Sequence, residues 1–340
     1  TAWITGDGRY HAHATRDPER HGIWRVAIRA LAPPHATHEI VCEAPDFSQP
    51  NWGGALGTQA WCRHTLMPHF CYSDPEEVLT FHNVITGELA RPAVPRPAGL
   101  CGIGPARGLV LLDTVDAGEV QVFDLETMEV RARFPCPRQS RVVAACWTPD
   151  GARLVTAGAD RIVRLLDAET GEPTGWREVS GHSEIVSALA VHPDGSLLAT
   201  GGKDHLILIR DMATGDLRTA YHGHLDGIAA LSFSPDGRYL VSTGTDGQVR
   251  IWSSRGDDGT VLRGHASYVY AVAFSPDGER MYSGGWDGSA GASGPRRSWD
   301  AAPGTPIASL GDDDRCGFSL AVTGGGSRLG TAGGERGRRW

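Results

Sequence analysis

Three short motifs recur along the second half of the chain, and they share one spacing. Pro-Asp-Gly turns place aspartates 41 to 44 residues apart, at Asp150, Asp194, Asp236 and Asp277. Gly-His pairs end at His182, His224 and His265, and a second aspartate series, Asp160, Asp204, Asp246 and Asp287, keeps the same phase. A period of roughly 40–45 residues is typical of stacked or radial repeats, in which each unit buries its apolar face against the next. The spacing therefore predicts a repeat architecture instead of a conventional catalytic domain.

One repeat, from His224 to Thr260, keeps every element of a pattern of four short strands. An apolar stretch at 228–233 precedes a Ser-Pro-Asp-Gly turn, in which proline fixes φ and glycine supplies a permissive dihedral. Residues 238–242 form the next expected strand, residues 248–252 alternate as a third, and a fourth lies around 260–262. Four antiparallel strands per period are typical of one blade of a β-propeller.

Composition restricts the functions that the chain can have. A net charge of −8 disfavours a nucleic-acid partner, because phosphates attract basic surfaces. No apolar run approaches the ~18 residues needed to span a bilayer, so no membrane partner is expected. Seven scattered cysteines indicate reduced thiols in a cytoplasmic protein. The chain begins with Thr1 instead of Met, as expected of a fragment or a processed chain.

Lysine is almost absent, which excludes two classes of phosphate-transfer enzyme. Lys203 is the only lysine, so nearly all positive charge is arginine, as is typical of a GC-rich bacterial genome. A P-loop requires Gly-Lys-Ser/Thr, but Lys203 is followed by Asp204. A protein-kinase core is excluded in the same way, because its strand lysine and its His-Arg-Asp loop are missing.

One cysteine–histidine cluster has the side chains for a metal site but not the spacing. Cys62, His64, His69 and Cys71 flank a Thr-Leu-Met-Pro turn and would share one face of a hairpin. Two cysteines and two histidines suit tetrahedral zinc, yet this spacing belongs to no common zinc motif, and strand cysteines are usually buried thiols. The glycines at 102–108 lack the helix of a dinucleotide site. We therefore expect neither metal nor cofactor.

The residues from about Val142 to Gly288 resemble the Trp-Asp (WD) repeat proteins. The resemblance lies in the Gly-His pair, Ser-Pro-Asp-Gly, an aspartate in the turn between the second and third strands, and a third strand ending in tryptophan. It implies an all-β propeller of four-stranded antiparallel blades. It also implies that a buried histidine, a strand hydroxyl, the turn aspartate and the tryptophan form a hydrogen-bonded chain in each repeat.

The repeats match this four-residue set to different extents. His224, Ser242, Asp246 and Trp252 supply all four members. Two repeats supply three members each: His182, Thr200 and Asp204, with Arg210 at the tryptophan position, and His265, Ser283 and Asp287, after which the expected strand is disrupted. Thr156 and Asp160 supply two members, with Leu166 in place of tryptophan.

Histidine, serine and aspartate in one unit could also suggest a hydrolase. A catalytic triad occurs once, whereas this set returns in successive repeats. The chain also lacks the Gly-x-Ser-x-Gly and His-Glu-x-x-His motifs. The set instead satisfies buried polar groups, each of which would cost ~1–3 kcal/mol if unpaired. We therefore expect a structural role for the set and no enzymatic activity.

The repeat phase extends in both directions, which predicts one propeller over residues 1–340. The clear repeats cover about 140–288, and diverged blades are expected over 1–139. Residues 289–340 are expected to form degenerate closing blades, because SAGASGPRR stands where a third strand should follow Asp287, and Trp299 comes about six residues late. An insertion, decayed repeats or a damaged reading frame would each give this pattern. Seven blades are expected, with eight as the alternative.

The WD-repeat resemblance also implies where a partner binds. Propellers of this family bind partners mostly on the face with the loops between blades and the turns between the second and third strands. On this sequence, that face would carry Tyr268, Tyr270 and Trp286, with Arg141, Ile185, Ser187 and Lys203 from neighbouring blades. Aromatic residues beside basic ones are the usual composition of a binding hot spot.

We therefore expect a monomeric, non-catalytic scaffold that binds a protein or peptide in the bacterial cytoplasm. The alternative is that the chain is the regulatory or sensor propeller of a larger bacterial signalling enzyme, such as a kinase or a protease-like protein. Fold by itself does not decide between them.

Overall fold

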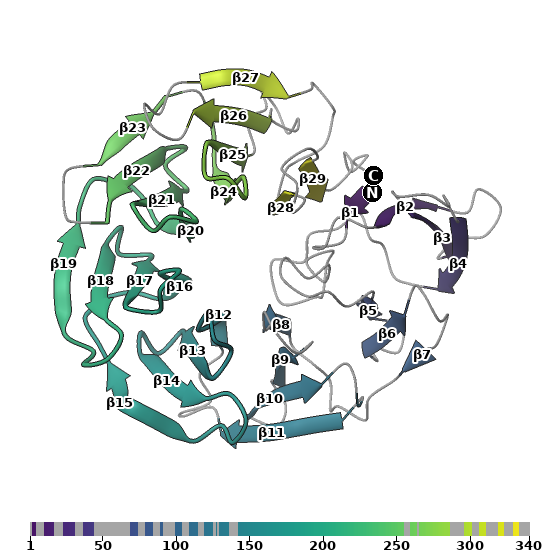
Figure 1. The fold of residues 1–340 in the computed structure, drawn as a ribbon, viewed down its shortest axis with the longest axis horizontal. Helices are drawn as coiled ribbons and strands as arrows, with labels where there is room; N and C mark the ends of the chain where they lie inside the picture. The colour runs from purple at the N-terminus through teal and green to yellow at the C-terminus, as the bar shows by residue number, and fades with distance from the viewer. Residues whose placement is uncertain are drawn as a thin grey trace, which may run out of the picture.

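The computed structural model of the chain consists of β-strands in sheets that are arranged radially around a common centre (Figure 1). The structure describes the backbone at 2–4, 10–16, 23–30, 37–43, 69–73, 79–83, 89–90, 99–103, 109–114, 119–124, 127, 129–135, 142–254, 259–263, 265–285, 296–300, 306–310, 319–322 and 329–332. Side chains are described at 120–124, 127, 129–133, 142–176, 178–254, 259–263, 265–285 and 299.

The first three sheets are formed by consecutive antiparallel strands. The first contains β1 (Ala2–Ile4), β2 (Tyr10–Arg16), β3 (Ile23–Ala30) and β4 (Thr37–Glu43). The second contains β5 (His69–Ser73), β6 (Leu79–Asn83) and β7 (Leu89–Ala90). The third contains β8 (Gly99–Ile103), β9 (Leu109–Thr114), β10 (Glu119–Asp124) and β11 (Glu129–Pro135).

The regular repeats form four sheets of four strands each. The first of them contains β12 (Val142–Trp147), β13 (Arg153–Gly158), β14 (Val163–Asp167) and β15 (Pro173–Val179), and the second contains β16 (Val186–Val191), β17 (Leu197–Gly202), β18 (Ile207–Asp211) and β19 (Leu217–Tyr221). The third contains β20 (Ile228–Phe233), β21 (Tyr239–Gly244), β22 (Val249–Ser253) and β23 (Thr260–Leu262). The fourth contains β24 (Val269–Phe274), β25 (Arg280–Gly285), β26 (Arg296–Asp300) and β27 (Pro306–Leu310). A final pair contains β28 (Ser319–Val322) and β29 (Leu329–Ala332). Within each four-stranded sheet we call the strands a, b, c and d in chain order.

These four-stranded antiparallel sheets confirm the predicted all-β, propeller-like class. Successive a strands lie next to one another, so that β12, β16, β20 and β24 line the inner side of the ring (Figure 1). β1 lies beside β29, which makes segments from the two ends of the chain neighbours. The number of blades in a closed ring stays a prediction.

The Pro-Asp-Gly turns hold the a and b strands together by a side-chain hydrogen-bond pattern. In the turn after β20, Ser234 Oγ donates to the Asp236 carboxylate at 2.6 Å, and the Arg238 amide donates to it at 3.0 Å. Gly237 adopts a φ of 72°, in the left-handed region that favours glycine. Asp150 accepts the corresponding bonds in its own turn. The aspartate therefore stabilises each of these turns by accepting hydrogen bonds from within the turn.

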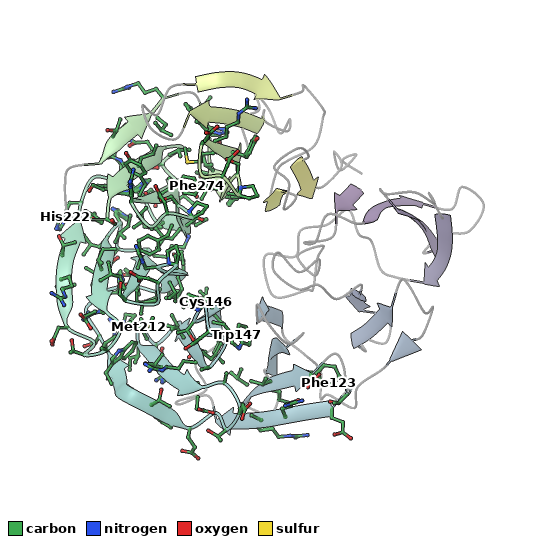
Figure 2. The ribbon with its side chains drawn as sticks, viewed as in Figure 1. Phe123, Cys146, Trp147, Met212, His222 and Phe274 are labelled. Carbon is green, nitrogen blue, oxygen red and sulfur yellow. The ribbon has the colours of Figure 1, made fainter. Side chains whose placement is uncertain are left out.

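The core lies between neighbouring sheets instead of within any one of them. Ile228 at the start of β20 packs against Gly201 of β17, where an added Cβ would come within 2.6 Å of the isoleucine side chain. Val155 and Leu165 pack in the same cluster as Val186 of the next sheet. Figure 2 shows side chains filling the spaces between successive sheets, with His222 at the outer edge of the ring. Burial of apolar surface between sheets thus stabilises the radial arrangement.

Each a strand of the regular repeats contains a β-bulge that the sequence did not predict. The pairing with the b strand shifts register between Val142 and Ala144, and it shifts at the same place in β16, β20 and β24. A bulge bends a strand and increases its local twist. One residue of each a strand, such as Ser187 or Tyr270, is therefore displaced from regular pairing.

The c strand that the sequence indicated as disrupted is present. β26 pairs with β25 on one side and with β27 on the other, with Met281 opposite Trp299. The strand begins at Arg296, later than the repeat phase indicates, which agrees with the alternative of an insertion after Asp287. Trp299 occupies the tryptophan position of this sheet, and its large side chain is fully buried there.

Candidate functional site

The complete four-residue set forms a continuous hydrogen-bonded chain inside the β20–β23 sheet. Trp252 Nε1 donates to Ser242 Oγ at 2.8 Å, and Ser242 Oγ lies 2.7 Å from His224 Nε2. His224 Nδ1 lies 2.9 Å and 3.1 Å from the two carboxylate oxygens of Asp246. A neutral histidine that donates from Nδ1 and accepts from the serine hydroxyl satisfies every one of these groups.

The Asp246 carboxylate also holds the loop that leads into β20. It accepts hydrogen bonds from the amides of Leu225 at 2.8 Å and Gln248 at 2.9 Å. Burial alone would raise the pKa of Asp246, but the bonds from His224 and the two amides outweigh it and leave that pKa below its ordinary value. The aspartate is therefore held as a carboxylate.

The preceding sheet has the same chain with its last member replaced. His182 lies 3.0 Å from Asp204 and 2.8 Å from the Thr200 hydroxyl. Arg210 is buried at the tryptophan position and donates to the carbonyls of Gly215 at 3.1 Å and Ser180 at 2.5 Å. Burial lowers the pKa of Arg210, because no charged partner offsets the loss of water among the described contacts.

The β24–β27 sheet completes its set with a residue from beyond the irregular segment. His265 Nε2 lies 2.7 Å from Ser283 Oγ, and Trp299 Nε1 donates to the same oxygen at 2.8 Å. Asp287, the predicted third member, lies outside the described residues. Trp299 is a member that the sequence did not assign, although the Trp-Asp pair at 299–300 was its signal.

The first regular repeat replaces histidine by arginine. Arg164 Nη2 donates to the Asp160 carboxylate at 2.7 Å, and the Ile162 amide donates to it at 3.2 Å. Thr156 is buried nearby in β13, and Leu166 occupies the tryptophan position as predicted. The turn aspartate thus keeps a cationic partner although its usual histidine is missing.

These sets are placed where no substrate can reach their hydroxyl groups. The side chains of Thr200, Ser242 and Ser283 have no exposed surface. A nucleophile must contact its substrate, so these hydroxyls support the fold instead of a reaction. A different nucleophile, the thiol of Cys146 in β12, is equally unsuited, because burial raises its pKa to about 12.

Apolar side chains are exposed at one end of the a strands. We call this end the loop face and define it by residues 142–143, 183–185, 203–205, 225–227, 245–247 and 266–268. Val143, Ile185, Leu225 and Tyr268 lie at or near the starts of β12, β16, β20 and β24, and they are 42, 37, 74 and 42% exposed. Leu217, which is 51% exposed, starts a d strand and therefore lies at the opposite end of the sheets.

The structure places the predicted partner-binding residues in three groups. Ile185, Lys203 and Tyr268 are exposed on the loop face, and the ring of Tyr268 packs edge-on against Tyr270 with centroids 6.1 Å apart. Ser187 is half-buried, and its hydroxyl donates to the Ile228 carbonyl at 2.5 Å, which joins two sheets. Arg141 and Trp286 lie outside the described residues.

Sequence reasoning missed two of the exposed apolar residues. Leu225 follows a Gly-His pair directly, so the repeat phase was a signal that could have identified it. Val143 stands at the bulge position of β12, which only the strand pairing reveals. The binding role of every residue on the loop face stays a prediction.

The residues considered for a metal site, and the described part of the chain, bear on the expectation of neither metal nor membrane partner. The side chains of Cys62, His64, His69 and Cys71 lie outside the described residues. Within the described part of the chain, no group of three histidine, cysteine or acidic residues could hold a metal ion. The same part contains no helix long and apolar enough to cross a bilayer.

Comparisons with known proteins agree with this geometry. The family model "WD domain, G-beta repeat" matches residues 176–211, 215–253 and 256–290, and the "Anaphase-promoting complex subunit 4 WD40 domain" matches residues 105–180. The angio-associated migratory cell proteins of Canis lupus familiaris and Homo sapiens are 34% and 32% identical to this chain over 97 residues. Those residues are 28% of this chain and span only 21% of the length of each relative. The WD repeats indicate a protein-interaction propeller.

Proposed function

Because this chain belongs to the WD-repeat family, we propose that it is a non-catalytic scaffold that binds a protein or peptide partner on its loop face. Buried Ser-His-Asp sets support the non-catalytic part, since they stabilise turns and offer no accessible nucleophile. The cytoplasmic location and the bacterial source stay predictions from composition.

One observation carries the choice of surface. Four of the five large hydrophobic side chains that are exposed among the described residues lie on the loop face, one from each of four successive sheets. Single exposed hydrophobic residues are ordinary, whereas a row of them on one face is typical of an interaction site. Tyr268 adds a ring that covers much apolar area with few rotatable bonds, which suits it to anchor a partner.

A pull-down with matched variants tests the proposal. The loop-face variant is I185S/L225S/Y268S, and the control is L217S, which removes a comparably exposed hydrophobic residue from the opposite face. We expect a partner that the native chain and L217S retain but the loop-face variant loses. Truncating a central anchor typically costs ~2 kcal/mol or more of binding free energy.

Two results would contradict the proposal, provided that all variants have the same melting temperature. Equal retention of every partner by the loop-face variant would move the site to another face. Failure of the native chain to retain any protein beyond those that bind the bare resin would remove the scaffold function. A second variant, Tyr268→Ala with Tyr270→Ala and Trp286→Ala, tests the predicted aromatic hot spot in the same way.

A further inference from the structure

One aspartate–glycine pair on the loop face has a geometry that the other described pairs lack. Six such pairs lie in the described part of the chain, at 150–151, 194–195, 226–227, 236–237, 246–247 and 277–278. At 226–227, the Gly227 amide donates a hydrogen bond to the side-chain carboxylate of Asp226 at 2.7 Å. Among the six, this is the pair in which the glycine nitrogen contacts the carboxyl group directly before it.

The glycine amides of the other five pairs are held by their turns. Gly237 donates to the Ser234 carbonyl at 2.9 Å, while the Asp236 carboxylate accepts from the Arg238 amide at 3.0 Å. The nitrogen and the carboxyl group of this pair therefore face different partners. Four more glycine amides donate in the same way to the carbonyl three residues before them, at 2.8 to 3.2 Å: Gly151, Gly195, Gly247 and Gly278.

The Asp226 carboxyl group is accessible and only weakly held. Its side chain is 56% exposed, and its ion-pair contact in the described part of the chain is with His205 at 4.0 Å, which is longer than a hydrogen bond. Residues 225–227 lie outside the strands, in the connection that leads into β20. A Cβ on Gly227 would lie 2.7 Å from Lys203 Cδ, so a larger residue would be crowded at this position. With glycine there, no side chain shields the backbone nitrogen.

We propose that the Asp226-Gly227 pair is a site of isoaspartate formation, a modification that requires no enzyme. The Gly227 nitrogen bonds to the carboxyl carbon of Asp226, the amide proton and the carboxyl hydroxyl leave together as water, and a succinimide ring results. Water then adds to the ring. Addition at the main-chain carbonyl carbon of Asp226 breaks its bond to nitrogen and leaves the chain connected through the side chain, whereas addition at the side-chain carbon restores aspartate.

Both steps conserve atoms and electrons, since the water that is released in the first step is regained in the second. The structure favours the first step because it holds the nitrogen against the carboxyl group that it must attack, and such positioning accelerates a reaction within one molecule. The inference goes beyond the proposed function and does not depend on it.

The product would alter the connection between the Gly-His pair and β20. The Gly227 carbonyl accepts hydrogen bonds from the Thr245 amide at 2.9 Å and from the Thr245 hydroxyl at 3.1 Å. Isoaspartate adds a methylene group to the backbone directly before Gly227 and leaves a free carboxylate there. The lengthened chain displaces the Gly227 carbonyl, so the Thr245 amide is expected to lose its partner and to exchange its hydrogen faster.

Ageing of the native chain followed by peptide mapping tests the proposal. The purified chain is incubated at physiological temperature in mildly acidic buffer and digested, and electron-transfer dissociation of the peptides distinguishes isoaspartate from aspartate. We expect about 10-fold more isoaspartate at 226 than at any of the five other described pairs, because their nitrogen atoms are held by different partners. Asp226→Glu keeps the charge but would require a larger ring, so no isomerised residue is expected at 226. Asp236→Glu is the matched control and should leave the rate at 226 unchanged.

Incubation in urea separates the effect of geometry from that of sequence. All six pairs lose their native contacts in the unfolded chain, so isoaspartate is expected at similar rates in each. In the native chain, faster hydrogen exchange of the Thr245 amide should accompany the modification and should be absent from Asp226→Glu aged in parallel.

Two results would overturn the inference and leave the proposed function untouched. The first is an equal amount of isoaspartate at 226 and at the five other described pairs of the native chain. The second is unmodified Asp226 in the native chain after the same period in which the chain in urea has isomerised, which would show that the native contacts protect this pair.

Discussion

The substitution Asp246→Ala is expected to lower the free energy of unfolding by about 2–4 kcal/mol. Alanine removes the acceptor for three donors, namely the ring of His224 and the amides of Leu225 and Gln248. A buried donor left without a partner costs ~1–3 kcal/mol. The His224 ring is fully buried and bears that cost, whereas the Leu225 amide is exposed and regains water, which limits the sum.

Urea unfolding followed by tryptophan fluorescence measures the effect, because Trp252 belongs to the same hydrogen-bonded chain. Asp246→Asn is expected to be nearly as destabilising, since each carboxylate oxygen accepts one backbone amide and the new amide group must face one of them. Asp236→Ala is the control, because that aspartate is exposed and should cost no more than about 1 kcal/mol. Equal losses for Asp246→Ala and Asp236→Ala would refute the structural reading of the set.

Three further predictions concern the same sheets. Arg210→Trp is expected to stabilise the fold by about 1 kcal/mol, because the substitution removes a buried cation and places an indole N–H beside the Thr200 hydroxyl. An unchanged or lower urea midpoint would contradict this prediction. Thr243→Val is expected to gain about 1 kcal/mol in the same assay, since the buried Thr243 Oγ1 has no hydrogen-bond partner among the residues that the structure describes, whereas a loss would show that the hydroxyl is satisfied. The depressed pKa of Asp246 stabilises the native chain above the ordinary carboxyl value of about 3.9, and this contribution is lost as the pH falls through the folded-state pKa. Asp246→Ala should therefore lose less stability than the native chain between neutral pH and about pH 3, and parallel acid curves would contradict this.

Much of the repeat fold could be predicted because its defining interactions are local and recur. The chain from His224 to Trp252 spans fewer than 30 residues, so its residue types and spacing can be compared directly between repeats. The Pro-Asp-Gly turns likewise carry their own hydrogen-bond acceptor at Asp236. Such local signals are sufficient to predict the strands of a repeat and all four members of the complete set.

The late tryptophan, Trp299, is the point at which the repeat spacing left alternatives open. A repeat phase assumes a constant turn length, and the segment after Asp287 breaks it. The structure restores the register through the pairing of Met281 with Trp299 and through the bond from the indole to Ser283. Strand pairing and burial can form with a longer connection between the second and third strands, because lengthening a loop costs little free energy. A prediction that counts residues from one repeat to the next cannot allow for such a longer connection.

The sequence by itself determined the repeat period, the all-β class and the residues that satisfy one another within a repeat. Only the tertiary structure decided the contacts between repeats and the local strand geometry. Examples are the hydrogen bond from Ser187 to the Ile228 carbonyl, the bulges of the a strands, and the close approach of the Lys203 side chain to Gly227. The physical reason is that contacts between sheets join residues from different repeats and depend on side-chain volume. No spacing in the sequence encodes that volume match, because each pair of neighbouring sheets packs with its own set of residues.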